Sequence, residues 1–196
     1  TFFSYVFGMI MAVILVITRA DGIRPHPVIF RVLGVIVNLT RSFPFLILMI
    51  AIIPFTRWLV GTTIGNNATV VPLVVAAAPF VARLIEQSLL EVDRGVIEAA
   101  QSMGASTWQL IWKVFIPEAT PSLINGSAIA ATTILGYSAM SGAVGGGGLG
   151  KLAIMYGYNR YQNDIMLATV VLLIIIVQLL QSFGDWATRR SDRRIK

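Results

Sequence analysis

Five long apolar stretches dominate the pattern of hydrophobic and polar positions along this chain. They cover residues 1–18, 32–55, 68–90, 122–144 and 165–183, and charged side chains interrupt them only at Arg41, Arg83 and Glu86. A helix needs roughly 20 mostly apolar residues to cross a bilayer, because lipid offers no hydrogen-bond partner to a peptide group. The pattern predicts an all-α membrane protein with five transmembrane helices, forming a single domain over residues 1–196.

The composition agrees with a membrane protein and excludes several kinds of site. Charged residues make up 12% of the chain and the mean hydropathy is +0.79, whereas a soluble domain carries about 25% charged residues. The chain has no Cys and one His, so we expect no metal site and no cofactor. The net charge of +6 is spread between apolar runs rather than gathered on a polar domain, so we expect no nucleic-acid partner.

The distribution of Lys and Arg predicts the orientation in the membrane. Cytoplasmic loops carry the excess of positive charge. If the N-terminus lies outside and Arg41 snorkels inward, the inner side receives eleven basic residues and the outer side three: Arg19, Arg24, Arg31, Arg41, Arg94, Lys113, Arg189, Arg190, Arg193, Arg194 and Lys196 against Arg57, Lys151 and Arg160. The loop 91–121 and a basic tail over 186–196 are then cytoplasmic. Because the first span begins at Thr1, we expect further residues ahead of it.

The loop 91–121 has the pattern of a helix, a turn and a second helix. Gly104 can end the first helix in the left-handed conformation, Ser106 or Thr107 can cap the second, and Pro117 is expected to end it. Four apolar side chains fall at i, i+3, i+4 and i+7 and predict one apolar face: Trp108, Ile111, Trp112 and Phe115. An amphipathic helix lying on the membrane interface is the alternative interpretation.

The spacing of residues in this loop resembles the EAA loop of ABC-importer permeases. Glu98-Ala99-Ala100 is followed after three residues by Gly104, after nine more by Val114, and after one more by Ile116-Pro117. The pattern of that family is EAA, three residues, Gly, nine residues, an aliphatic residue, one residue, an aliphatic residue and Pro. Segments elsewhere are similar to the permease subunit of bacterial methionine importers, a five-span protein: 54–57, 60–62, 77–83, 136–140 and 145–150.

The resemblance carries implications for partners, substrate and site. It implies a type I importer permease in a bacterial inner membrane, paired with a second copy of itself, with cytoplasmic ABC ATPase subunits and with a periplasmic or lipid-anchored binding protein. The substrate would be L-methionine, with D-methionine as a second candidate, and transport would proceed by alternating access. ATP hydrolysis would take place on the partner, so this chain would not be an enzyme and would have no catalytic residue. The residues coupling to the ATPase would be Glu98, Ala99, Ala100, Gly104 and Pro117.

Two further groups of residues lie within the predicted spans. Small side chains fill residues 122–144, which predicts either ordinary close helix packing or a pathway lining. We hypothesise that Met140 forms an apolar gate between two copies, with Tyr137, Ser138 and Ser141 beside it. Arg83 and Glu86 are three residues apart, which allows an ion pair within one helix, either structural or engaged in transport.

Other functions stay open from the residues alone. An ABC permease for another small polar substrate is the nearest alternative. An ion-coupled secondary transporter would need intramembrane carboxylates and inverted repeats, and only Glu86 is available. The run Gly145–Lys151 fits a phosphate-binding pattern, but Leu152 stands where a P-loop needs Ser or Thr. We therefore expect a flexible turn there, or a contact surface for the binding protein.

Overall fold

The computed structural model describes residues 1–191, and every regular element in that range is helical. Residues 192–196, part of the expected basic tail, lie outside the described range. The α-helices are α1 Phe2–Thr18, α2 Pro27–Ser42, α3 Phe45–Ala51, α4 Ile53–Val60, α5 Asn66–Leu90, α6 Arg94–Ser102, α7 Thr107–Leu110, α8 Ile116–Ser141, α9 Leu149–Leu152 and α10 Asn163–Ser191. Two π-helical segments, Ile111–Phe115 and Ala153–Tyr158, and one 3-10 turn, Gly142–Val144, complete them.

The helices confirm the all-α membrane fold and alter two of the expected spans. Within residues 1–191, three helical stretches are long and apolar enough to cross a membrane: α5, α10 and the run Thr107–Val144. The second span is not one helix, because α2 and α3 meet at an angle of 105°. With α1, a shorter apolar helix of 17 residues, these make five apolar segments. The last span is longer than expected, because α10 extends to Ser191.

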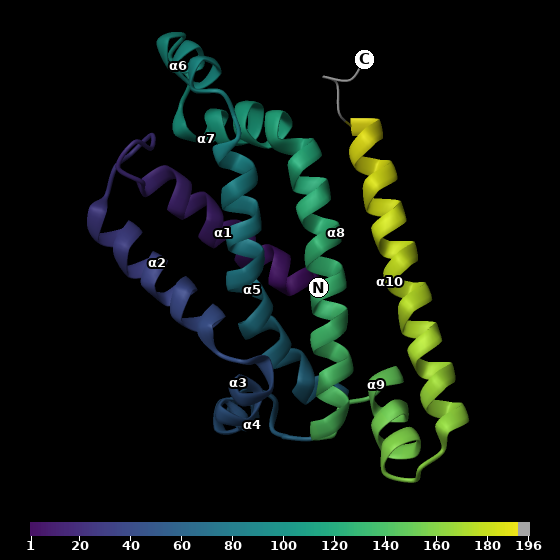
Figure 1. The fold of residues 1–196 in the computed structure, drawn as a ribbon. Coiled ribbons are helices and arrows are strands. Elements are labelled where there is room, and N and C mark those ends of the chain that lie inside the picture. Colours follow the sequence, from purple (N-terminus) through teal and green to yellow (C-terminus); the bar gives the residue numbers. More distant parts are fainter. Residues whose placement is uncertain (192–196) are drawn as a thin grey trace.

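Helix α5 lies at the centre of the bundle, between α1, α2 and α8 (Figure 1). Its side of the core consists of small and branched residues that pack against α1 and α8: Ala77, Val81, Ala82 and Ile85 with Ala12, Val16, Ala130 and Ile134. A Cβ atom built on Gly8 would lie 2.7 Å from Cγ1 of Val81. The small residues therefore allow α1 and α5 to approach closely.

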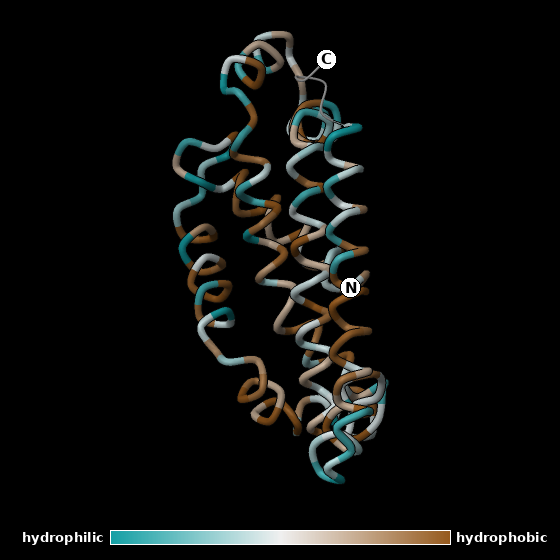
Figure 2. Tube along the Cα trace, turned by 45° about the vertical axis from the view of Figure 1, so that its right-hand side comes forward, coloured by the Kyte–Doolittle hydropathy of each residue, from teal (hydrophilic) through white to brown (hydrophobic). Residues whose placement is uncertain are grey.

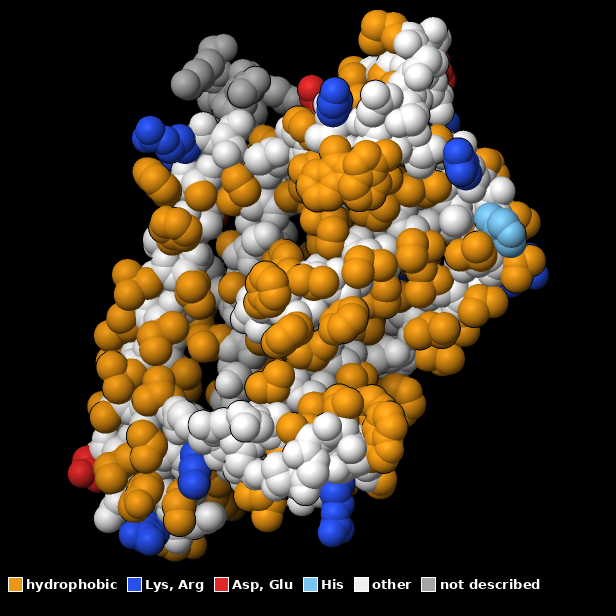
Figure 3. Space-filling model, turned by 180° about the vertical axis from the view of Figure 1, so that it is seen from behind, with side chains coloured by type: hydrophobic (Ala, Val, Ile, Leu, Met, Phe, Trp, Pro, Cys, Tyr) orange, Lys and Arg blue, Asp and Glu red, His pale blue; other side chains and the backbone are white. Residues whose placement is uncertain are grey.

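The two ends of the bundle differ from its middle in polarity. The α1–α2 loop, α6 and α7 lie at one end, here named the α6 end, and α3, α4 and α9 lie at the other, the α9 end (Figure 1). Hydrophilic residues lie toward the two ends and along α2 in Figure 2, and Lys and Arg gather at the ends on the face shown in Figure 3, with hydrophobic side chains between them. This distribution is that of a protein whose middle is embedded in lipid.

Candidate coupling loop and intramembrane sites

The loop 91–121 folds as the expected helix, turn and helix. The Asp93 side chain caps α6 by accepting a hydrogen bond from the backbone N–H of Gly95 at 2.7 Å. Gly104 follows α6 with φ +81°, a conformation that side chains with a Cβ rarely adopt. Ser106, rather than Thr107, caps α7: its Oγ accepts from the N–H of Gln109, and Oε1 of Gln109 accepts from the N–H of Ser106.

Pro117 does not end the second helix, contrary to expectation. The backbone passes from α7 through the π-helical turn Ile111–Phe115 into α8 while Phe115 and Ile116 keep helical dihedral angles. Pro117 stands in the first turn of α8, where a proline fits the backbone geometry. Local π geometry is one of the adjustments by which membrane helices accommodate a proline. The second helix of the loop 91–121 therefore continues into the fourth span without a non-helical break.

The apolar face predicted for the second helix is split in two. Ile111 and Phe115 are buried, whereas Trp108 and Trp112 are 68% and 53% exposed, with ring centroids 5.5 Å apart. The π-helical turn Ile111–Phe115 has more residues per turn than the 3.6 on which the predicted face was based. Ile111 and Phe115 thus anchor the loop to the core, whereas Trp108 and Trp112 remain exposed at its surface.

The EAA residues also divide between core and surface. Ala100 is buried in the same cluster as Leu110 and Phe115, whereas Glu98 and Ala99 are exposed. Val96 and Met103 stand about one helical turn before and after Ala99 and are both exposed, Met103 to 82%. We name as the candidate docking surface the exposed set Val96, Ala99, Met103, Gly104 and Trp108. An exposed apolar group of this kind is typical of a protein interaction site.

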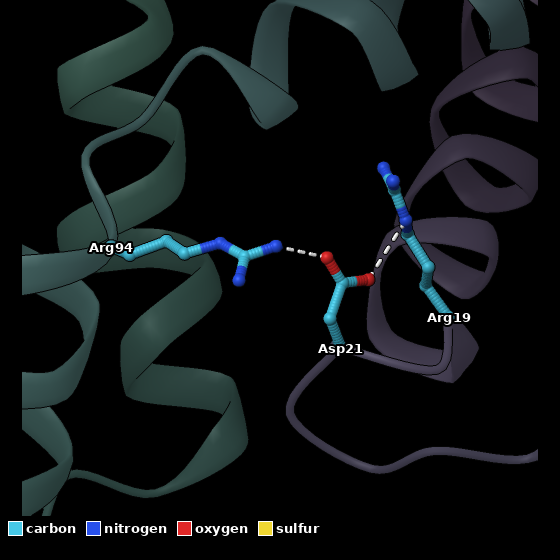
Figure 4. A network of polar contacts seen from close by, with 3 residues as sticks. All are labelled: Arg19, Asp21 and Arg94. Atoms are coloured by element: carbon cyan, nitrogen blue, oxygen red, sulfur yellow. Dashed lines mark hydrogen bonds and ion pairs between the residues drawn. The ribbon is translucent and has the colours of Figure 1, made fainter.

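Asp21 joins the α1–α2 loop to α6 (Figure 4). Oδ1 of Asp21 forms an ion pair with Nε of Arg19 at 2.8 Å, and Oδ2 pairs with the Arg94 guanidinium of α6. These residues and Glu98 line a hollow of about 320 Å³ between the loop, the end of α5 and α6. Asp21 was not among the predicted site residues, although it is the only acidic residue between α1 and α2.

We expect Asp21→Asn to loosen the α1–α2 loop with little loss of global stability. The three side chains are between 33% and 72% exposed, and solvent-screened pairs contribute about 0–1 kcal/mol. Hydrogen exchange should accelerate in residues 19–26 and stay unchanged in α5. Asp164→Asn, at the α9 end, is the matched control, and equal exchange of the α1–α2 loop in both variants would contradict the expectation.

Arg83 and Glu86 form the expected pair and reach a third residue. Nη1 of Arg83 lies 2.5 Å from Oε2 of Glu86, and Nη2 donates to Oδ1 of Asn38 on α2 at 2.9 Å. Glu86 is only 5% exposed. The guanidinium thus satisfies a buried carboxylate and ties α5 to α2, which favours a structural role.

The four residues expected at the gate point in different directions. Met140 is 46% exposed near the end of α8. Tyr137 stacks on Phe45 of α3, with ring centroids 4.7 Å apart and planes at 9°. Ser141 is buried, donates to the carbonyl oxygen of Ser138 at 2.7 Å, and its own carbonyl accepts from the N–H of Gly146 at 3.0 Å. Met140 alone combines a long apolar side chain with exposure.

The glycine-rich segment forms a close backbone packing between α8, α9 and the start of α5. Gly145 has φ +89°, and its carbonyl accepts from the N–H of Gly65 at 3.2 Å. A Cβ on Gly150 would overlap the carbonyl oxygen of Ala139, and one on Gly147 would overlap the side chain of Asn66. The glycines therefore permit close approach of backbones. The phosphate-binding pattern in the sequence does not predict this packing role.

Arg41 lies far from the α1–α2 loop, whose basic residues are expected on the same side of the membrane as Arg41. It stands in the last turn of α2, which begins at Pro27, so about 21 Å of helix separate the two. An arginine side chain cannot span that distance. Arg41 instead lines a cavity beside the break between α2 and α3.

Comparison with known proteins places the chain in a family. Residues 4–196 match the model of the binding-protein-dependent transport system inner membrane component. The chain is 53% identical to the probable D-methionine transport system permease protein MetI of Vibrio cholerae, over 97% of this chain and 85% of the relative. It is 45% identical to the methionine import system permease protein MetP of Bacillus subtilis, over 92% of this chain and 82% of that protein.

Solved structures agree in fold. A chain of the inward-facing MetNI methionine ABC transporter superposes with a TM-score of 0.96 at 47% identity, over 98% of this chain and 89% of that one. A chain of an amino acid ABC transporter superposes at 0.74 with 20% identity, over 96% of this chain and 87% of that one, which shows the shared fold alone. These matches, which cover nearly the whole of the all-helical bundle, show that the chain belongs to the family of inner-membrane permease components of binding-protein-dependent ABC transport systems.

Proposed function

We propose that this chain is the permease of a methionine importer and forms the translocation path as a single domain over residues 1–196. The observation that carries the proposal is the coupling loop, a helix–turn–helix with an exposed apolar surface that continues directly into a membrane span. The substrate is supported by the relatives, whose names specify methionine or D-methionine. No energy-converting site is needed in this chain, because the free energy comes from a partner.

The partners are a second copy of the permease, cytoplasmic ABC ATPase subunits and an external binding protein. The coupling loop, residues 91–121, takes up movement of the ATPase. Ala99 and Gly104 provide the close surface, Glu98 borders it, Ala100 anchors α6 to the core, and Pro117 starts the span that moves. Closure of the ATPase pair then tilts the helices and alternates access to the pathway.

The α6 end faces the cytoplasm and the N-terminus lies outside. Basic residues support this orientation: Arg19, Arg24, Arg31, Arg94, Lys113, Arg189 and Arg190 belong to the α6 end, whereas Arg57, Lys151 and Arg160 belong to the α9 end. Since the chain has no Cys, single cysteines at Ser106 and Asn163 can be labelled with a membrane-impermeant maleimide in whole cells. Labelling at Asn163 only agrees with the proposal, and labelling at Ser106 only reverses it.

Uptake by the reconstituted assembly tests the function. Vesicles containing permease, ATPase and binding protein should accumulate labelled methionine only with internal ATP. Other amino acids, added as competitors, should displace it weakly. Preferred uptake of a different small polar solute would favour the alternative substrate. Methionine uptake driven by a proton or sodium gradient in vesicles of this chain alone would favour a secondary transporter instead.

Met140→Ala tests the apolar gate between two copies. Shortening the side chain should widen the constriction and raise passive leak of methionine through ATP-free vesicles about tenfold, because hydrophobic constrictions close by excluding water. Met155→Ala, a second half-exposed methionine at the α9 end, is the control. An unchanged leak together with parental coupling of ATP hydrolysis to uptake would remove Met140 from the gate.

A further inference from the structure

The second apolar segment leaves helical conformation at Phe43 and Pro44. Both residues have extended backbone, with ψ of 131° each, as expected for a residue before proline and a proline that begins a new helix. Non-helical backbone at membrane depth is stable only where protein covers it or where it borders a polar cavity. Broken helices are accordingly common at transport sites.

A cavity of about 200 Å³ lies beside this break. Two polar side chains of α2, Thr40 and Arg41, form one side of it. The remaining wall is largely aromatic and comes from the break, α3, α5 and α8: Phe43, Phe45, Phe80 and Tyr137. Stacking of Phe45 on Tyr137 fixes the junction of α3 with α8. Small-molecule sites have this composition, an apolar lining with a few placed polar groups.

The Arg41 guanidinium is available to a ligand. Among the described residues it forms neither an ion pair nor a side-chain hydrogen bond, whereas the intramembrane Glu86 is already paired with Arg83. Arg41 is exposed, and an arginine within an apolar membrane segment is a candidate functional residue. Arg83 also holds Asn38, one turn before Arg41 on α2, so the position of Arg41 is fixed relative to α5.

We propose that this cavity binds, within the permease itself, a zwitterionic amino acid with an uncharged apolar side chain. The ligand carboxylate pairs with Arg41, the ammonium group lies against an aromatic face, and a thioether or alkyl side chain packs among Phe45, Phe80 and Tyr137. The volume is below the roughly 300–1,000 Å³ of drug-sized sites, which suits one amino acid. The inference rests on the proposed function and adds a selectivity step independent of the binding protein.

Binding to the purified permease–ATPase assembly, without binding protein, tests the site. Labelled methionine should bind the parent saturably, and Arg41→Gln should weaken that component at least tenfold. Arg41→Lys, which keeps the charge, should retain part of it. Arg57→Gln, an exposed arginine of α4, is the control for loss of one positive charge. Methioninamide, which lacks the carboxylate, should compete poorly for the component that depends on Arg41.

Selectivity separates a ligand contact from a structural role. Phe80→Ala should change the order in which leucine, norleucine and methionine compete for uptake, because it removes one aromatic wall of the cavity. Binding that is equal in parent and Arg41→Gln, or full competition by the amide, overturns the site. If the parent assembly accumulates methionine in that case, the proposed function stands without the site. If the parent accumulates a different solute, the proposed function fails.

Discussion

Ala99→Glu is expected to abolish assembly with the ATPase while leaving the permease folded. Ala99 is exposed on α6, beside the apolar side chains of the candidate docking surface. A carboxylate introduced there would be buried without a partner when the ATPase docks. Such a charge costs an interface about 2–5 kcal/mol, which weakens assembly by roughly thirtyfold or more. Co-purification with the ATPase and ATP-driven uptake should both be lost.

Two controls separate docking from folding in this experiment. Gln162→Glu adds the same charge at the exposed α9 end and should leave assembly intact. Ala100→Glu places the charge in the core beside Leu110 and Phe115, so it should reduce the amount of folded chain. An Ala99→Glu variant that still co-purifies and transports at the parent rate would show that α6 is not the docking helix.

Glu86→Leu is expected to destabilise the permease strongly. The substitution leaves the Arg83 guanidinium, 22% exposed, with Asn38 as its remaining partner. Breaking a buried pair on one side costs about 3–5 kcal/mol, whereas replacing both charges by apolar residues is often neutral. Thermal unfolding of the detergent-solubilised chain should therefore show a large loss in Glu86→Leu and recovery in the double variant Arg83→Leu with Glu86→Leu.

The double variant also decides between the two roles considered for this pair. Recovery of both stability and methionine uptake means that the charges serve packing alone. Recovered stability with abolished uptake would assign a transport role to Arg83 or Glu86. A double variant as unstable as Glu86→Leu would contradict the pairing as the source of the effect.

Local sequence signals predicted the turn within the loop 91–121. Gly104 and Ser106 act through hydrogen bonds to residues at most a few positions away, so local spacing located the turn and limited the cap to Ser106 or Thr107. The apolar runs located α1, α5 and α8 for the same reason, because crossing a bilayer depends on the length and polarity of one segment.

Features that depend on several distant segments were not predictable. The run 32–55 is apolar throughout most of its length, so its hydropathy gave no sign of the bend at Pro44. Asp21 and Arg94 are 73 residues apart, and no local pattern pairs them. Pro117 was misjudged because a proline disfavours the interior of a helix but suits its first turn. The aromatic cavity depends on four separate elements meeting, which a single sequence does not specify.

The unbroken helical path from α7 into α8 links the rotational position of residues in the loop 91–121 to that of residues in the span. Along a continuous helix each residue turns everything beyond it by about 100°. Trp108 and Tyr137 lie on that one path, with no loop between them to absorb a mismatch. Insertion or deletion of a single residue would therefore rotate Tyr137 away from Phe45 while Trp108 stayed in place. The number of residues between these two aromatic side chains therefore fixes their relative rotation about the helix axis.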